Sequence, residues 1–166
     1  MRAASRFWLF LMVLLPLSAA GQEVQDAFSP HQGATQLVVA TIAEAKQTVR
    51  VAAYSFTSLP IGDALIAATG RGVDVKVVLD RKQNGRRSLL DYLRESGVPT
   101  RINGHYAIMH NKFMIIDGRV LELGSFNYTK AAEEKNAENV LVIRDQPRVI
   151  ADYSRQWEKL WEEGEE

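Results

Sequence analysis

Residues 50–80, RVAAYSFTSLPIGDALIAATGRGVDVKVVLD, contain two apolar runs separated by a segment with helical features. The runs at 50–56 and 72–80 are short and end at turn-forming residues, which is typical of buried strands. Between them, Pro60 marks the start of a helix and Gly70 marks its end. A strand, a crossover helix and a second strand form a βαβ unit with parallel strands. We therefore predict an α/β fold with a mixed, mainly parallel β-sheet flanked by helices on both faces.

Segments with regular apolar patterns lie on both sides of this unit. Apolar residues at helical spacing predict helices over residues 35–49 and 85–96, and a strand is expected around residues 139–143. A last helix from Pro147 carries an apolar stripe that includes Trp157 and Trp161, which we interpret as core packing. Residues 34–166 are thus expected to form one domain, which is large enough to bury a core without disulfides or metals.

The first 20 residues have the pattern of a secretory signal peptide. Arg2 and Arg6 precede an unbroken apolar run at 7–17, and the small residues Ser18 and Ala20 fit the cleavage rule. The alternative is an uncleaved anchor, although the run is shorter than the about 20 residues that a membrane span needs. We therefore expect a periplasmic or secreted domain, or one anchored to the inner membrane and facing the periplasm. The polar, turn-rich residues 21–33 are expected to be a linker.

Composition excludes some classes of site and leaves others open. The chain has no cysteine and only three histidines, which excludes a disulfide framework and argues against a zinc site of the usual type. Its formal net charge is zero, but residues 71–101 carry eight basic and four acidic side chains, and the last five residues read EEGEE. This asymmetry fits a face that meets phosphate, and it equally fits a solvated arginine-rich surface.

A second stretch, HNKFMIIDGRVLELGSFN at residues 110–127, places polar side chains at the outer ends of two apolar runs. The Asp-Gly pair at 117–118 predicts a hairpin with a two-residue loop, in which Ile116 opposes Arg119. Asp117 then lies at the turn, away from the polar ends, and is expected to have a supporting role.

In this register the polar side chains at the two outer ends converge. Opposed residues point to the same side of a sheet, and alternate residues along a strand share that side. One patch then combines an imidazole, an ammonium, a hydroxyl and an amide, which together can hold a phosphodiester and attack it. Gly124 removes a side chain where something approaches the backbone closely. The four converging residues are His110, Lys112, Ser125 and Asn127.

The spacing of this stretch resembles the HxK(x)4D(x)6GSxN signature of the phospholipase D superfamily, without departure. The segments AYSFT at 53–57, GVDVKVVLD at 72–80 and GSFNYTKAAEEKNAEN at 124–139 are similar to the small secreted bacterial endonucleases of that superfamily, the Nuc type. Proteins of this type carry one signature per chain, whereas larger relatives carry two and build one site between them. The resemblance implies the phospholipase D/nuclease fold and a homodimer whose two chains complete one site.

The resemblance also implies two-step phosphoryl transfer without a metal or other cofactor. His110 of one subunit attacks phosphorus, and the partner subunit's His110 protonates the leaving oxygen and then activates water. Lys112 and Asn127 stabilise the extra charge on the phosphoryl oxygens, with Ser125 as a further hydrogen-bond donor. Glu138 is matched to the carboxylate that holds the second ring nitrogen of the nucleophile, and a solvated charge at a strand start is the alternative.

Three functions stay open at this point. The first is a metal-independent endonuclease that acts on DNA, or also on RNA, with Arg81 and Lys82 of the arginine-rich segment among the substrate contacts. The second is hydrolysis of a lipid phosphodiester, but the sequence shows no exposed amphipathic helix for a membrane, so no lipid partner is expected. The third is a catalytically silent nucleic-acid-binding module, and the intact His110 argues against it.

Overall fold

The computed structural model of the protein describes residues 23–83, 85 and 88–166. The signal peptide expected over residues 1–20 lies outside the described residues. None of the described helices is long and apolar enough to cross a membrane.

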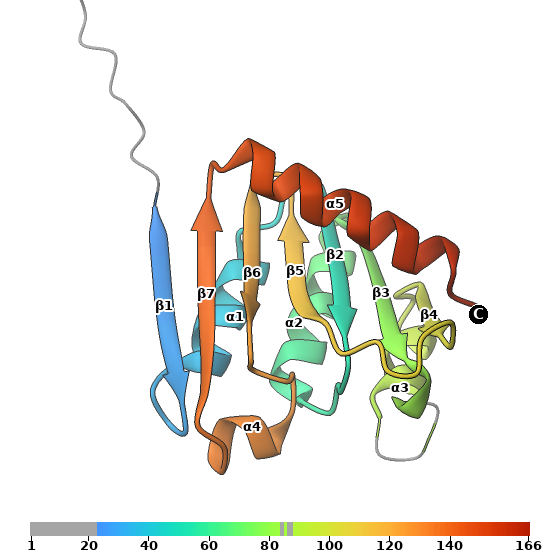
Figure 1. The fold of residues 1–166 in the computed structure, drawn as a ribbon, viewed down its shortest axis with the longest axis horizontal. Coiled ribbons are helices and arrows are strands. Elements are labelled where there is room, and N and C mark those ends of the chain that lie inside the picture. The colour runs from blue at the N-terminus through green and yellow to red at the C-terminus, as the bar shows by residue number, and fades with distance from the viewer. Residues whose placement is uncertain (1–22, 84, 86–87) are drawn as a thin grey trace, which may run out of the picture.

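Seven strands form one sheet in the order β1-β7-β6-β5-β2-β3-β4 (Figure 1). Strands β2, β3 and β4 are parallel neighbours, and the other four pairs of neighbours are antiparallel. The predicted mixed α/β sheet is confirmed, but its description as mainly parallel is wrong, because four of the six pairs of neighbouring strands are antiparallel. The strands are β1 Val24–Ser29, β2 Thr48–Ala53, β3 Asp74–Asp80, β4 Thr100–Asn103, β5 Lys112–Ile116, β6 Val120–Gly124 and β7 Glu138–Arg144.

Helices cover both faces of the sheet, as predicted. Helices α1 and α2 lie behind the sheet in the view of Figure 1, and α5 crosses its front face near the upper edge. Short helices α3 and α4 and a 3₁₀ turn, η1, connect strands at the lower edge. The bounds are α1 Ala34–Ala43, α2 Leu59–Gly70, η1 Arg81–Gln83, α3 Leu90–Glu95, α4 Lys130–Glu134 and α5 Pro147–Glu162.

The segment expected to be a linker, residues 21–33, contains strand β1 instead. Its six residues pair with β7 from Val24 opposite Ile143 to Ser29 opposite Glu138. Within β1 only Ala27 and Ser29 are buried, because an edge strand has one solvated side. The linker prediction is therefore wrong. Polar composition misled it, because an edge strand with one solvated side can be as polar as a loop.

Helix α1 ends at Ala43, although apolar spacing continues to Val49. Val49 is fully buried, but it belongs to β2. The backbone N–H groups of residues 46–48 donate to the Asp117 carboxylate and are therefore unavailable to a helix. A tertiary contact thus ends the helix earlier than the sequence pattern indicates.

The apolar stripe of α5 packs on the front face of the sheet, as predicted. The Trp157 indole N–H donates to the carbonyl of Val51 at 2.9 Å, which fixes the helix across β2. The Trp157 ring stacks on Trp161 with centroids 5.3 Å apart, and the Arg50 guanidinium lies 5.3 Å from the Trp157 centroid. These aromatic rings are core residues with basic side chains packed around them.

A carboxyl group is buried on the opposite face, which the sequence did not predict. Glu122 of β6 is 1% exposed, and its Oε2 accepts a hydrogen bond of 2.6 Å from the hydroxyl of Tyr128. Burial raises the pKa of Glu122 to about 8, and the hydrogen bond from Tyr128 lowers it in part. The carboxyl is therefore mainly protonated at pH 7.

We expect Glu122→Gln to flatten the dependence of stability on pH. The pKa of Glu122 is about 8 in the folded chain against a reference value of 4.5, so its contribution to stability is fully present below pH 4.5 and is lost as the pH rises to about 8. The slope in that window is at most about 1.4 kcal/mol per pH unit. Glutamine keeps an acceptor for Tyr128 but cannot ionise. Urea unfolding at pH 5 to 9 measures this, and parallel curves for both proteins would contradict it.

Candidate active site

Four strand ends meet at the lower edge of the sheet in Figure 1. Strands β2 and β6 end there, and strands β5 and β7 begin there. His110 precedes β5 by two residues, Lys112 opens it, and Glu138 opens β7. Ser125 and Asn127 directly follow β6. The fold therefore brings the polar ends of the signature to one edge.

The hairpin between β5 and β6 has one more residue in its loop than predicted. Arg119 N–H donates to the Ile116 carbonyl at 3.0 Å, but Val120, not Arg119, pairs with Ile116. Arg119 is an extra residue, and its carbonyl accepts the N–H of Asp145 instead. A shift of one residue reverses the facing of a strand, so the predicted convergence by alternation is wrong.

Residues after β6 depart from the strand pattern that the prediction assumed. Phe126 and Tyr128 are buried in the core beneath α1 and α2, and Asn127 lies between them. Ser125 is exposed and hydrogen-bonds to Glu138 across the β6–β7 junction. Ser125 thus reaches the edge because the chain leaves the sheet after Gly124, not because it opposes His110 in a ladder.

Gly124 is required by the neighbouring strand. A Cβ atom at this position would lie 2.1 Å from the carbonyl oxygen of Asn139. The close approach predicted at Gly124 is real, but it is made by β7. The contact places Asn139 N–H 3.1 Å from Ser125 Oγ and so aligns the start of β7 with the end of β6.

His110 and Lys112 are in direct contact. Lys112 Nζ donates to the His110 carbonyl at 2.8 Å and lies 3.0 Å from Nδ1 and 3.3 Å from Nε2 of the ring. Lys112 is buried, and desolvation lowers its pKa, while the charge of Glu138 raises it in part. A neutral imidazole has one ring nitrogen with a lone pair available for attack, and here the ammonium lies beside that ring.

Tyr54, which sequence reasoning did not assign to the site, packs against this pair. Its ring centroid is 4.4 Å from that of His110, and Lys112 Nζ lies 5.2 Å from the same centroid. Tyr54 N–H donates to the Asn111 carbonyl at 2.8 Å, just beyond the β2–β5 ladder. The signal in the sequence was its position at the carboxyl end of a buried strand, where sites in α/β folds occur.

Glu138 contacts residues other than the one predicted. Its Oε2 lies 2.6 Å from Ser125 Oγ and its Oε1 3.0 Å from Asn136 Nδ2. Among the residues that the structure describes, these are its hydrogen-bond partners, and His110 is not one of them. Its orienting role on the His110 ring stays a prediction, and the contact observed in this chain orients Ser125.

The other predicted residues lie at different distances from the site. Lys82 Nζ is 6.0 Å from the Tyr54 centroid, whereas Arg81 faces the next loop and donates to the Ala107 carbonyl at 3.4 Å. Asn127 Oδ1 is buried without a hydrogen-bond partner among the described residues. Asp117 lies at the far end of the hairpin, where its carboxylate accepts three backbone N–H groups.

The chain is similar to known proteins over most of its length. A family model described as "Cardiolipin synthase, PLD-like domain" matches residues 38–161. The chain belongs to the phospholipase D superfamily. It is a phosphodiesterase of that superfamily, and the family and fold expected from the signature are confirmed.

Two solved structures and one curated relative illustrate the similarity. The phospholipase D family member Nuc from Salmonella typhimurium is 43% identical, with a TM-score of 0.84 over 87% of this chain and 97% of that chain. NucT from Helicobacter pylori is 26% identical, with a TM-score of 0.76 over 86% and 98%. A phospholipase D from Rickettsia typhi is 36% identical over 137 residues, which cover 82% of this chain and 67% of the relative.

We expect Tyr54→Ala to lower kcat/KM for a small phosphodiester, bis(p-nitrophenyl) phosphate, by about tenfold, because the His110 ring loses the surface that positions it. Tyr54→Phe should retain activity, since the observed contacts involve the ring and not the hydroxyl. Steady-state kinetics over a range of pH measures kcat/KM for each variant. A changed pH profile indicates a displaced His110 ring, whereas a loss of folded protein lowers kcat/KM without changing the shape of the profile. Equal losses in both variants would show that the hydroxyl is what matters.

Proposed function

We propose that this chain is an endonuclease that hydrolyses phosphodiester bonds of DNA, and of RNA as a further substrate, by attack of His110 on phosphorus. The observation that supports it is the contact between an exposed imidazole and the buried Lys112 ammonium, which lies 3.0 and 3.3 Å from the two ring nitrogens. A phosphate at this position would meet a nucleophile and a positive charge together. No metal is required for this arrangement to act.

The reaction has two steps, formation of a bond between His110 and phosphorus and then its hydrolysis. The unprotonated ring nitrogen of His110 forms a bond to phosphorus while the bond from phosphorus to the leaving oxygen breaks, and a second imidazolium gives that oxygen a proton. The second imidazole then removes a proton from water, which attacks phosphorus and releases His110. Each turnover restores both rings to their starting protonation states.

The second imidazole has to come from another copy of the chain. In the part of the chain that the structure describes, His31 N–H donates to Glu133, and His105 lies against Tyr106 and Glu163. Neither ring has a described contact with His110. A homodimer with a two-fold axis at the lower sheet edge would supply the partner subunit's His110.

A lipid phosphodiester is the second candidate substrate. Ile108, two residues before His110, is an apolar side chain that is 45% exposed, and several relatives are named phospholipase D. The similarity to Nuc, and the Lys82 ammonium 6.0 Å from the Tyr54 ring, support nucleic acid instead. We accordingly propose nucleic acid first, in the periplasmic or secreted location that the leader indicates.

Cleavage of plasmid and single-stranded DNA in excess EDTA tests the proposal. We expect EDTA-resistant activity in the wild type and a loss of at least about 10³-fold in His110→Ala and Lys112→Ala. His31→Asn and Lys135→Ala, which change exposed residues of the same types elsewhere, should retain activity. Circular dichroism confirms that each variant is folded.

Two other outcomes of this cleavage experiment would support a different function. A wild type that leaves DNA and RNA intact but hydrolyses cardiolipin in vesicles would establish the lipid function. A wild type that binds DNA but cleaves none of these substrates would indicate a silent binding module.

A mixing experiment tests the shared site. When wild type and His110→Ala are co-expressed in equal amounts, a site that needs both imidazoles leaves about one quarter of the wild-type activity, whereas independent sites leave about one half. Activity should therefore fall with the square of the wild-type fraction. A linear decrease would show that each chain acts alone.

A further inference from the structure

Two adjoining cavities lie beside β4, one of about 510 Å³ and one of about 480 Å³. Arg94 and Glu166 line both cavities, so the two are neighbours, and we treat them together as one groove. Its walls come from η1, α3, β4, the loops on either side of β4, and the end of α5 with the chain after it. We call it the arginine groove after its basic residues, Arg81, Arg94 and Arg101.

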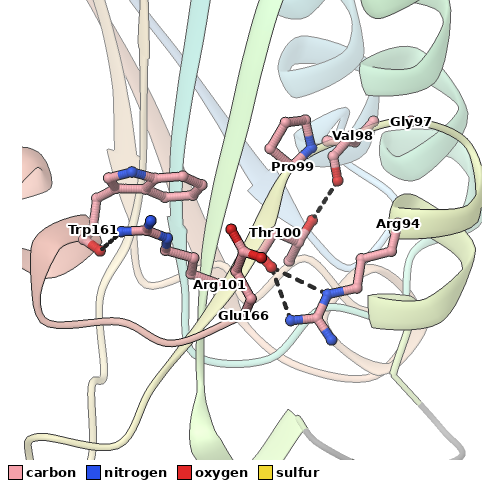
Figure 2. A pocket seen from close by; sticks show the side chains of 8 residues that line it. All are labelled: Arg94, Gly97, Val98, Pro99, Thr100, Arg101, Trp161 and Glu166. Carbon is pink, nitrogen blue, oxygen red and sulfur yellow. Dashed lines mark hydrogen bonds between the residues drawn. The ribbon is translucent and has the colours of Figure 1, made fainter.

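The three arginines keep unused hydrogen-bond donors. Arg101 lies over the Trp161 ring at 4.5 Å and donates from Nη1 to the Trp161 carbonyl, but its Nε is buried without a partner (Figure 2). Arg94 donates from Nε and Nη2 to the Thr100 carbonyl. Within the described residues none of the three forms an ion pair with a carboxylate. A guanidinium has five N–H donors, so each retains its charge and several free donors.

The acidic segment 163–166 occupies part of this groove. Glu165 and Ile102 exchange two backbone hydrogen bonds of 2.7 and 2.9 Å, which hold the segment along the free edge of β4. In Figure 2 the Glu166 side chain projects between those of Arg94 and Arg101. Oε2 of Glu163, which also lines the groove, is buried without a hydrogen-bond partner.

Carboxylates and guanidiniums thus line the same groove without a described ion pair between them, while Oε1 of Glu163 contacts Tyr106, His105 and Lys159. Buried polar groups are normally paired, and an unpaired group calls for an explanation such as a ligand. Three buried side-chain atoms of the described residues lack partners, and two of them, Arg101 Nε and Glu163 Oε2, belong to groove residues. Of these two, only the Arg101 Nε donor can pair with a phosphate oxygen. The third, on Asn127, belongs to the signature.

The groove continues toward the catalytic histidine. Arg81 lines it, and the next residue, Lys82, has its Nζ 6.0 Å from the Tyr54 centroid. The Tyr54 ring in turn packs on His110 at 4.4 Å. Basic side chains therefore follow one path from the reacting imidazole to β4, which suits a ligand with phosphates in series. A lipid headgroup would need only the end of this path.

We infer that the arginine groove binds the sugar-phosphate backbone of a nucleic-acid strand whose scissile phosphate lies at His110, and that the glutamates of segment 163–166 compete with this backbone for the arginines. The inference rests on the proposed nuclease function. In this inference, arginines of the stretch at 71–101 bind the nucleic-acid backbone, and glutamates of the acidic EEGEE segment compete with it. Phosphate contacts carry affinity without base preference, so the groove adds strength and not sequence specificity.

Fluorescence anisotropy with a labelled 20-nucleotide single-stranded DNA tests this inference in the non-cleaving His110→Ala protein. Glu165→Gln with Glu166→Gln should tighten binding by about three- to tenfold, because two competing charges are removed. Arg94→Gln and Arg101→Gln should each weaken binding and reduce the salt slope by about one. Controls are Glu158→Gln and Arg148→Gln, exposed residues of α5 outside the groove, which should leave binding unchanged.

Hydrolysis of bis(p-nitrophenyl) phosphate separates this inference from the proposed function. Groove variants with intact His110 should match the wild type on this substrate, which is too small to reach the groove, and should differ only on DNA. A wild type that cleaves neither substrate overturns the nuclease proposal, while anisotropy still reports on the groove.

Two results would overturn the inference itself. Unchanged affinity in the Glu165/Glu166 variant would exclude competition by the acidic segment, and that variant alters exposed side chains, so misfolding does not confuse the result. Binding of cardiolipin vesicles with the same arginine dependence, but no binding of DNA, would assign the groove to a membrane surface. Arg101→Lys, which keeps the charge over Trp161, checks that Arg101→Gln does not act through packing.

Discussion

The register of β5 against β2 is the constraint on which the active edge depends. Ala53 pairs with Lys112, so the next residue, Tyr54, meets the His110 ring. A slip of one residue would turn Lys112 to the other face of the sheet. Asp117 prevents this slip from the far end of the hairpin. Its carboxylate accepts the N–H groups of residues 46–48 at 2.8 Å each and ties the turn to the start of β2.

The charge of Asp117 is suited to that task. Partial burial raises the pKa of its carboxyl, but hydrogen bonds from Thr48, Lys46 and Gln47 and the charge of Lys46 outweigh the burial, and the pKa is held below its ordinary value. The carboxylate therefore stays ionised at neutral pH, and the clamp weakens only as the pH falls through this lowered pKa. One residue of the signature thus helps to position Lys112 from the other end of the five-residue strand β5.

The sequence was sufficient for the parts of the fold that depend on local pattern. The βαβ unit and the tryptophan stripe of α5 follow from apolar periodicity, and the closeness of His110 and Lys112 follows from their separation of two residues in the sequence. Strand β1 was missed because its pairing with β7 lies over a hundred residues away and leaves no periodic trace in a half-solvated edge. The extra residue in the hairpin loop, Arg119, was missed because the hydrogen bond to its carbonyl comes from the N–H of Asp145, which is distant in the sequence.

Some polar residues at and near the candidate site have their hydrogen bonds satisfied within the chain, and others do not. Asp117 and Ser125 have their acceptors or donors engaged within the chain, and so they hold geometry. Asn127 Oδ1 and Arg101 Nε are buried yet unpaired among the described residues. A buried polar atom without a partner costs stability in the free protein, roughly 1 to 3 kcal/mol for a neutral group. Arg101 Nε is a donor, so an oxygen of a bound phosphate backbone would remove that cost there, whereas Asn127 Oδ1 is an acceptor and needs a donor.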